Sequence, residues 1–417
     1  MNLLKTSVLN GIAVLVKTAT MFILNKILAV YVGPSGYAAI GQFQNFIQMV
    51  TSFAGGAINT AVVKYTAEYG DNPNEQHKIW QNAGTIILVL SVIFSLLIIL
   101  FQKSLSLYIF HSTEYQSVFT WFGIFLIFFN FNALFLAILN GKKEILKLVI
   151  ANIAGSVFSL LITGFLAYQY HILGALIALS IYQSIAFFIT LILCVKSDWF
   201  KFEFLFGKID KAIATKFGHY ALMALVSVFF GNYAQIELRK LIIDKFDITY
   251  AGYWDAMSRL SGGYLMLATT ILSVYYLPRL SELREFKDIK DEIFYGYKVI
   301  LPLAILGSAF IYLFRETVVN LLFTKSFMPM LELLSWQLLG DIIKIGSWII
   351  SFVMLSKAMT KIFIVTEIIF ALSIIPVTLI CINFFGFKGI AIAFTLNCLS
   401  YWIVCSIWVF SSLRKIQ

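Results

Sequence analysis

Charged residues and cysteines are scarce in this chain. Only 12% of its 417 residues are charged, against about 25% in an average soluble domain, so a water-soluble globular protein and a disordered chain are both excluded. The four cysteines lie in apolar runs and form no CxxC pair, which argues against a disulfide framework. The four histidines are not spaced as metal ligands, so we expect no metal site.

Catalytic signatures are also missing. The sequence contains no G-x-S-x-G, no phosphate-binding loop, no H-E-x-x-H and no G-x-G-x-x-G. We therefore expect a protein that is not an enzyme, holds no cofactor and cannot hydrolyse ATP alone. Any work it does must draw on an ion gradient, the membrane potential or downstream consumption of its substrate.

Long apolar runs dominate what is present. Hydrophobic residues make up 60% of the chain, 40 of them phenylalanine, and a run of about 20 such residues spans a bilayer as a helix. The runs do not alternate in polarity as barrel strands do. The prediction is an all-α polytopic membrane protein with twelve transmembrane helices, at residues 7–31, 38–63, 80–101, 118–139, 146–168, 172–195, 217–243, 249–277, 294–314, 329–355, 360–384 and 388–410.

The distribution of positive charge predicts the orientation. With the N-terminus in the cytoplasm, the cytoplasmic loops and ends receive 19 Lys and Arg residues and the other side 7. Because positive residues are retained on the cytoplasmic side, we expect both termini there. This asymmetry explains the net charge of +10 without nucleic acid. The first apolar run is long and contains lysines, unlike a cleavable signal peptide.

A weak internal repeat predicts the domain organisation. Similar short segments recur at a spacing of 214–216 residues, including those around Lys26 and Lys240 and around Gly174 and Gly389. Six spans per repeat insert both halves the same way up, which predicts two parallel-repeat lobes around a central cavity. We expect an N-lobe at 1–195, a cytoplasmic linker at 196–216 and a C-lobe at 217–417. The basic, aromatic linker is predicted on the membrane surface, or else as a solvated connection.

Lysines embedded in the first span are candidate ligand-binding residues. A charge at the bilayer centre costs about 2.5–3.5 kcal/mol, so it should face a cavity, be paired or act on a ligand. Lys17 lies near the middle of the span without a carboxylate three or four residues away. Lys26 lies near the outer mouth, where its side chain could snorkel.

Later spans carry acids beside cations. Asp255 and Arg259 are four residues apart, and Asp341 and Lys344 are three apart. One reading is two intrahelical ion pairs that hold their helices in register. The other is that the cations bind an anionic substrate while the acids accept a coupling ion. Glu367 is a lone acid at membrane depth and a candidate proton site.

A polar stripe follows one face of the second span. Its spacing of three to four residues puts the members on one side of a helix, where they either line a wet cavity or let helices approach closely. The stripe consists of Gly41, Asn45, Gln48, Ser52, Gly55 and Asn59.

Three stretches give the chain a resemblance to a known family. They are 15–46, 273–283 and 336–346, the last reading WQLLGDIIKIG. With these stretches the sequence resembles the Wzx-type polysaccharide flippases of the multidrug/oligosaccharidyl-lipid/polysaccharide exporter superfamily, the group of O-antigen translocases and enterobacterial common antigen lipid III flippases. The resemblance covers nearly the whole chain.

The resemblance implies a function. Its members move undecaprenyl-pyrophosphate-linked oligosaccharide repeat units from the inner to the outer leaflet of the bacterial cytoplasmic (inner) membrane by alternating access, for surface polysaccharide synthesis. The matching motifs supply Lys17, Lys26, Asp341 and Lys344, whereas Arg259 and Asp255 rest on the charges alone. The candidate substrate residues are Lys17, Lys26, Asn45, Gln48, Arg259 and Lys344, and the coupling-ion or ion-pair candidates are Asp255, Asp341 and Glu367.

The expected partners and the alternatives follow from the same reading. Partners are the lipid-linked glycan, membrane lipids and, further along the synthesis, a polysaccharide polymerase and a chain-length regulator, and the chain is expected to work as a monomer. The first alternative is an ion-coupled drug exporter of the same superfamily, which would want an acidic cavity. A polysaccharide polymerase or ligase would need a larger outward loop than the roughly 16-residue connections at 102–117 and 315–328. A passive scaffold would have no use for Lys17.

Overall fold

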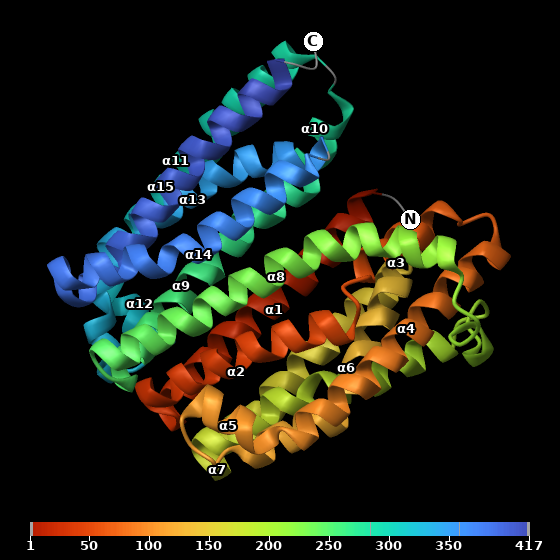
Figure 1. Cartoon of the computed structure of the whole chain (residues 1–417), viewed down its shortest axis with the longest axis horizontal. Helices are drawn as coiled ribbons and strands as arrows, with labels where there is room; N and C mark the ends of the chain where they lie inside the picture. The colour runs from red at the N-terminus through yellow and green to blue at the C-terminus, as the bar shows by residue number, and fades with distance from the viewer. Residues whose placement is uncertain (1–2, 284, 358, 415–417) are drawn as a thin grey trace. The chain divides into compact units, whose positions relative to one another are not determined.

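The computed structural model describes residues 3–283, 285–357 and 359–414, and within these ranges the regular structure is helical throughout. The first part of the chain forms α1 (Leu3–Tyr31), α2 (Gly33–Ala54), α3 (Asn59–Glu68), α4 (Pro73–Leu100), α5 (Gln102–Phe110), α6 (Gln116–Gly141) and α7 (Ile145–Val195). The rest forms α8 (Lys211–Lys245), α9 (Ile248–Ile271), α10 (Leu277–Glu282), α11 (Phe286–Leu313), α12 (Arg315–Leu322), α13 (Leu331–Ser356), α14 (Thr360–Phe385) and α15 (Gly389–Arg414) (Figure 1).

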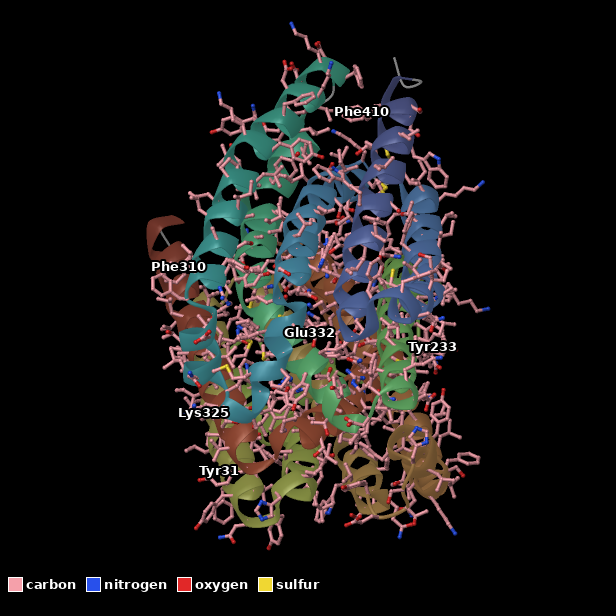
Figure 2. The ribbon with its side chains drawn as sticks, turned by 90° about the vertical axis from the view of Figure 1, so that its left-hand side faces the viewer. Tyr31, Tyr233, Phe310, Lys325, Glu332 and Phe410 are labelled. Atoms are coloured by element: carbon pink, nitrogen blue, oxygen red, sulfur yellow. The ribbon has the colours of Figure 1, made fainter. Side chains whose placement is uncertain are left out.

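The helices group into two compact units. The first unit runs to residue 32 and continues from 39 to 228, and the second contains 33–38 and everything from 229 onward. The change at Phe229 falls inside α8, so one continuous helix belongs to both units. Within the second unit, Lys325 and Phe410 lie toward opposite ends (Figure 2), as the antiparallel course of α13, α14 and α15 requires.

Among the residues that the structure describes, seven helical stretches are long and apolar enough to cross a membrane, or eight when the bent pair α2 and α3 is counted as one span. Two of these stretches each contain two long helices. His171 has non-helical backbone angles and divides α7 in two, and the stretch 360–413 contains both α14 and α15. The number covers only the described residues, and α8 contains positions whose side chains lie outside them, so it does not decide whether α8 is a span. The all-helical membrane fold is thus confirmed, and the twelve-span layout stays a prediction.

The internal repeat is visible in local backbone geometry. His171 and Gly386, 215 residues apart, both have a positive φ, 49° and 60°. Three residues later in each case, a glycine starts the returning helix against the preceding one. A Cβ atom on Gly174 would lie 1.9 Å from the carbonyl oxygen of Leu166, and one on Gly389 would lie 2.4 Å from that of Cys381. Both helix hairpins need a residue without a side chain at the same place.

We expect Gly174→Ala and Gly389→Ala each to lower the free energy of unfolding by about 1–3 kcal/mol, because the added methyl group forces two helix backbones apart. Gly155→Ala is the matched control, since its Cβ would meet Ala186 at an ordinary 3.6 Å and alanine favours the helix. Thermal unfolding in detergent measures the difference. Equal melting temperatures for Gly174→Ala and Gly155→Ala would contradict the close approach.

Several of the predicted span boundaries differ from the helix boundaries in the structure. The predicted connections at 102–117 and 315–328 begin with short helices, α5 and α12. Each follows a single phenylalanine with a bent backbone, Phe101 or Phe314. Polar residues there mark where a helix bends and not where helical structure stops. The predicted span 38–63 is broken between α2 and α3, with a bend of 46°, and 249–277 passes through a π-helical segment at Leu272–Tyr276.

The connection before α8 packs on α4. Leu205 is buried, and a Cβ on Gly84 would lie 2.1 Å from the Leu205 carbonyl oxygen. The His77 and Phe204 rings stack with centroids 3.5 Å apart. The linker is therefore attached to the first unit by specific contacts. Phe202 and Phe206 are exposed, and their contact with the membrane surface stays a prediction.

Candidate functional site

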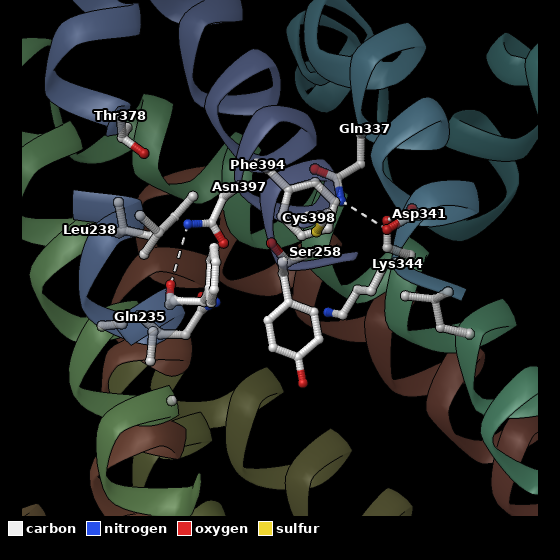
Figure 3. Close-up of a pocket in the computed structure, with 18 of the residues that line it drawn as sticks. Gln235, Leu238, Ser258, Gln337, Asp341, Lys344, Thr378, Phe394, Asn397 and Cys398 are labelled. Carbon is white, nitrogen blue, oxygen red and sulfur yellow. Dashed lines mark hydrogen bonds between the residues drawn. The ribbon is translucent and has the colours of Figure 1, made fainter. Parts of the chain in front are cut away.

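The second unit encloses a pocket of about 450 Å³ between α8, α9, α13, α14 and α15. Its wall mixes aromatic and aliphatic side chains with a small number of polar ones, as ligand pockets do. The polar and charged side chains on the wall are Gln235, Ser258, Ser261, Gln337, Asp341, Lys344, Ser347, Glu367, Thr378, Asn397 and Tyr401 (Figure 3).

Two glycines bring α13 and α15 together behind this pocket. A Cβ on Gly340 would lie 2.6 Å from the Phe394 ring, and one on Gly346 would lie 2.9 Å from Trp402. The absence of side chains at these two positions lets large aromatic rings of α15 reach the α13 backbone. The next residue along from Gly340, Asp341, is thereby held at the edge of the pocket.

Asp341 is fully buried and accepts three hydrogen bonds. Ser261 donates to Oδ2 at 2.6 Å and Gln337 to Oδ1 at 3.2 Å, the latter drawn in Figure 3. Tyr264 also donates to Oδ2. A buried carboxylate is tolerated at membrane depth only when such donors replace its water. Two of the donors come from α9, so Asp341 ties α13 to α9.

Lys344 lies one turn further along α13 and points into the pocket (Figure 3). Its Nζ is 5.3 Å from the centroid of the Trp348 ring and 5.4 Å from that of Phe394, a cation–π arrangement. Across the described ranges, the ion pairs within 4.0 Å do not include Lys344. Of the two readings of Asp341 and Lys344, the described residues do not show the intrahelical ion pair: neighbouring hydroxyl and amide groups bind the carboxylate, and the ammonium faces aromatic rings and the pocket.

Glu367 reaches the same pocket from α14. Its Oε1 accepts a hydrogen bond from the Tyr401 hydroxyl at 3.1 Å, which in turn is 2.8 Å from Ser351 Oγ. Three of the residues singled out from the sequence, on two different helices, are thus brought together on one wall. An anion, a cation or a hydroxyl-rich group would each find a complementary partner among them.

Asp255 and Arg259 lie elsewhere, and the hydrogen-bonded partner of Asp255 comes from another helix. Asp255 forms a bidentate ion pair with Arg239 of α8, at 2.7 Å and 2.6 Å, and both side chains are buried. Arg259 instead lies 5.2 Å from the centroid of the Tyr37 ring. Neither Asp255 nor Arg259 is on the wall of the pocket. Arg239 lies in the last third of α8 and is buried.

The remaining candidates belong to the first unit. Lys17 and Lys26 lie on α1, the first exposed and the second half-buried. Asn45 and Gln48 lie on α2, the first half-buried and the second exposed. The Asn45 amide nitrogen is buried without a hydrogen-bond partner among the described residues. These four residues do not line the pocket of the second unit.

Sequence reasoning missed the uncharged part of the site. Tyr264, Ser261 and Gln337 support Asp341, and Tyr401 supports Glu367. Single hydroxyl and amide groups in apolar helices carry no periodic signal that separates them from packing residues. Gln337 is the exception, because it belongs to the stretch WQLLGDIIKIG and lies four residues before Asp341 on the same helix face.

The chain has relatives of known name. It is 28% identical over 371 residues to the lipid III flippase of Escherichia coli K12 and equally to that of Shigella flexneri, with 88% of each chain covered. Its structure is similar to a multidrug resistance MATE family transporter of the MOP superfamily in the inward-facing conformation, with a TM-score of 0.78, 15% identity and coverage of 95% of this chain and 96% of that one. For an outward-facing MATE transporter the TM-score is 0.62, with 16% identity and coverage of 97% and 96%.

These similarities confirm the resemblance found in the sequence. The structural neighbours establish the fold, since their identity is too low to carry more. The sequence profile of the polysaccharide biosynthesis protein family matches residues 3–284, more than half of the chain. The protein belongs to the polysaccharide biosynthesis protein family.

Proposed function

We propose that the protein is a flippase that moves undecaprenyl-pyrophosphate-linked oligosaccharide repeat units from the inner to the outer leaflet of a bacterial cytoplasmic membrane. The observation that carries this proposal is Lys344, a lysine at membrane depth that faces a pocket without a carboxylate partner. A cation is kept in such a place when an anionic ligand uses it. Relatives that are named lipid III flippases support the same assignment.

The substrate explains why a protein is needed. A pyrophosphate with attached sugars cannot enter hydrocarbon, because each polar group that loses its water costs several kcal/mol. Lys344 of the second unit would offset part of the pyrophosphate charge. In the first unit, Lys17 remains a candidate for the same role, and the amide groups of Asn45 and Gln48 remain candidates for sugar hydroxyls. The polyprenyl tail would remain in lipid.

The proposed architecture is twelve transmembrane helices in two six-helix lobes, residues 1–195 and 217–417, connected by the linker 196–216. The repeated hairpin geometry at His171 and Gly386 supports this layout, and so does the similarity to transporters of the MOP superfamily. Transport by alternating access, cytoplasmic termini, activity as a monomer and contact with a polymerase and a chain-length regulator are parts of the same proposal. We expect transport without a catalytic step.

A drug exporter is the second candidate function. Two acidic side chains in the pocket, Asp341 and Glu367, favour it, because acids suit cationic drugs. However, Asp341 is engaged by three donors and Glu367 by Tyr401, whereas Lys344 has no acidic partner. The charged group on the pocket wall that has no hydrogen-bonded partner among the described residues is therefore the Lys344 ammonium, and its positive charge favours an anionic ligand.

Flipping in proteoliposomes tests the proposal. With a fluorescent undecaprenyl-pyrophosphate-linked glycan and a quencher outside, we expect the wild type to redistribute the lipid and Lys17→Ala to do so about 10- to 100-fold more slowly, the loss of one charged interaction of about 1.5–3 kcal/mol. Lys103→Ala, at an exposed position, is the control and should match the wild type. The proposal is contradicted if folded wild-type protein, with an ion gradient present, redistributes the lipid no faster than protein-free vesicles do. That result would favour drug export.

A further inference from the structure

The break between α2 and α3 borders a second pocket, and this one lies entirely in the first unit. Its volume is about 240 Å³, and its wall comes from both sides of the break, from α6 and from the first half of α8. The side chains that matter for its chemistry are Thr51, Ser52, Asn59, Thr60, Phe129 and Asn130. Three of the positions in the polar stripe of the second span, Ser52, Gly55 and Asn59, face this pocket.

The backbone beside the pocket is not continuous helix. Gly56 and Ala57 both have a positive φ, 65° and 48°, so the chain turns out of α2 before α3 starts at Asn59. The N-cap residue of α3 is Ile58, whose side chain makes no capping hydrogen bond. A helix end inside a membrane needs partners for its first N–H groups, and the polar wall of the pocket adjoins this end.

One polar atom on the wall is buried and unsatisfied. Asn59 Oδ1 has no hydrogen-bond partner among the described residues. By contrast, Asn130 donates to Ser91 Oγ at 2.8 Å and so is fixed in place by α4. A buried carbonyl oxygen without a donor costs about 1–3 kcal/mol, so its retention beside a cavity indicates a ligand that supplies the donor.

The lining residues select the class of ligand. None of the ten residues on this wall is charged, so the pocket offers nothing to offset a pyrophosphate or to bind a cation strongly. It offers amide and hydroxyl groups, which serve both as donors and as acceptors, and one aromatic ring, Phe129. This combination suits an uncharged ring that carries several hydroxyl or acetamido groups.

We infer that this pocket is a subsite for one uncharged sugar of the glycan. The inference rests on the proposed function. In it, different residues bind different parts of the substrate: cationic side chains bind the pyrophosphate, and the Asn59 pocket binds a sugar ring. The pocket would then contribute to transport only when the lipid carries a sugar.

Two lipid probes, both labelled on the lipid tail, separate the roles. One is undecaprenyl pyrophosphate with a single N-acetylhexosamine and the other is bare undecaprenyl pyrophosphate. Asn59→Leu removes the acceptor at similar volume, and Ala133→Leu fills the pocket from α6. We expect each variant to slow flipping of the glycosylated probe about tenfold and to leave the bare probe within about twofold of the wild type. Asn152→Leu, an exposed amide on α7, should change neither.

The inference is overturned if Asn59→Leu slows both probes equally or slows neither. Failure of the proposed function has another signature, since the wild type would then move neither probe. In that case the affinities of the two probes for wild type and Asn59→Leu in nanodiscs decide the matter. A preference of the wild type for the glycosylated probe that Asn59→Leu abolishes would support the subsite, and equal affinities would exclude it.

Discussion

Arg239→Met is expected to lower the free energy of unfolding by about 3–5 kcal/mol, because it leaves the Asp255 carboxylate buried without its partner. The guanidinium is bound by two hydrogen bonds of 2.7 Å and 2.6 Å and lies 5.3 Å from the centroid of the Trp254 ring. Arg239 and Asp255 are only 2% and 5% exposed, so water cannot replace the missing charge. Thermal and denaturant unfolding of the purified protein in detergent would measure the loss.

The double variant Arg239→Met/Asp255→Leu shows whether the loss of stability in Arg239→Met comes from the unpaired Asp255 charge or from the lost packing contacts of the Arg239 side chain. Replacing both charges by apolar groups of similar volume is often neutral or stabilising, so most of the stability should return. Lys240→Met is the matched control, since its partner Glu237 is only part-buried at 3.1 Å and such pairs contribute about 0–1 kcal/mol. A double variant no more stable than Arg239→Met would refute the account.

Lys344→Ala is expected to lower the rate of flipping about 10- to 100-fold, with the melting temperature nearly unchanged. The rate falls because the pocket loses its unpaired cation, worth about 1.5–3 kcal/mol in a charged hydrogen bond. Stability is retained because the side chain contacts the Trp348 and Phe394 rings and holds no ion partner in the described structure. The proteoliposome assay and a melting curve measure the two quantities on the same preparation.

Lys344→Arg provides the charge-retaining comparison and should restore a substantial part of the rate. Lys361→Ala, at an exposed lysine near the start of α14, is the control for removing a positive charge in general. Wild-type flipping by Lys344→Ala would remove Lys344 from the binding site. A large drop in melting temperature would instead show that Lys344 serves packing.

Helices and membrane class were predictable because long apolar runs leave one physical solution. Local deviations were not, because the polarity changes at Phe101 and Phe314 in the same way whether a helix bends or ends there, and the break at Gly56 does not interrupt its apolar run. The sequence also placed Asp341 and Lys344 correctly on one helix, but spacing alone could not tell an ion pair from two separate environments. Which donors surround Asp341 depends on α9, and that contact is set by tertiary packing.

The same limit applies to Arg239 and Asp255. Spacing along one helix favoured Arg259 as the partner of Asp255, whereas the structure provides Arg239 from the preceding helix. Arg239 lies sixteen residues before Asp255 on a different helix, so no helical periodicity in the sequence connects the two residues.

The Arg239–Asp255 pair has a consequence for how the chain enters the membrane. α8 leaves the ribosome before α9, because it precedes α9 in the chain. Arg239 lies in the last third of α8. A charge at membrane depth costs up to about 2.5–3.5 kcal/mol of insertion free energy, and α8 would bear its share of that cost until Asp255 emerges. Insertion as a helical hairpin, with the two charges neutralised before they meet lipid, avoids it. Biogenesis of the second unit would then begin with a paired insertion step, and the order of synthesis would matter as much as the hydropathy of either helix.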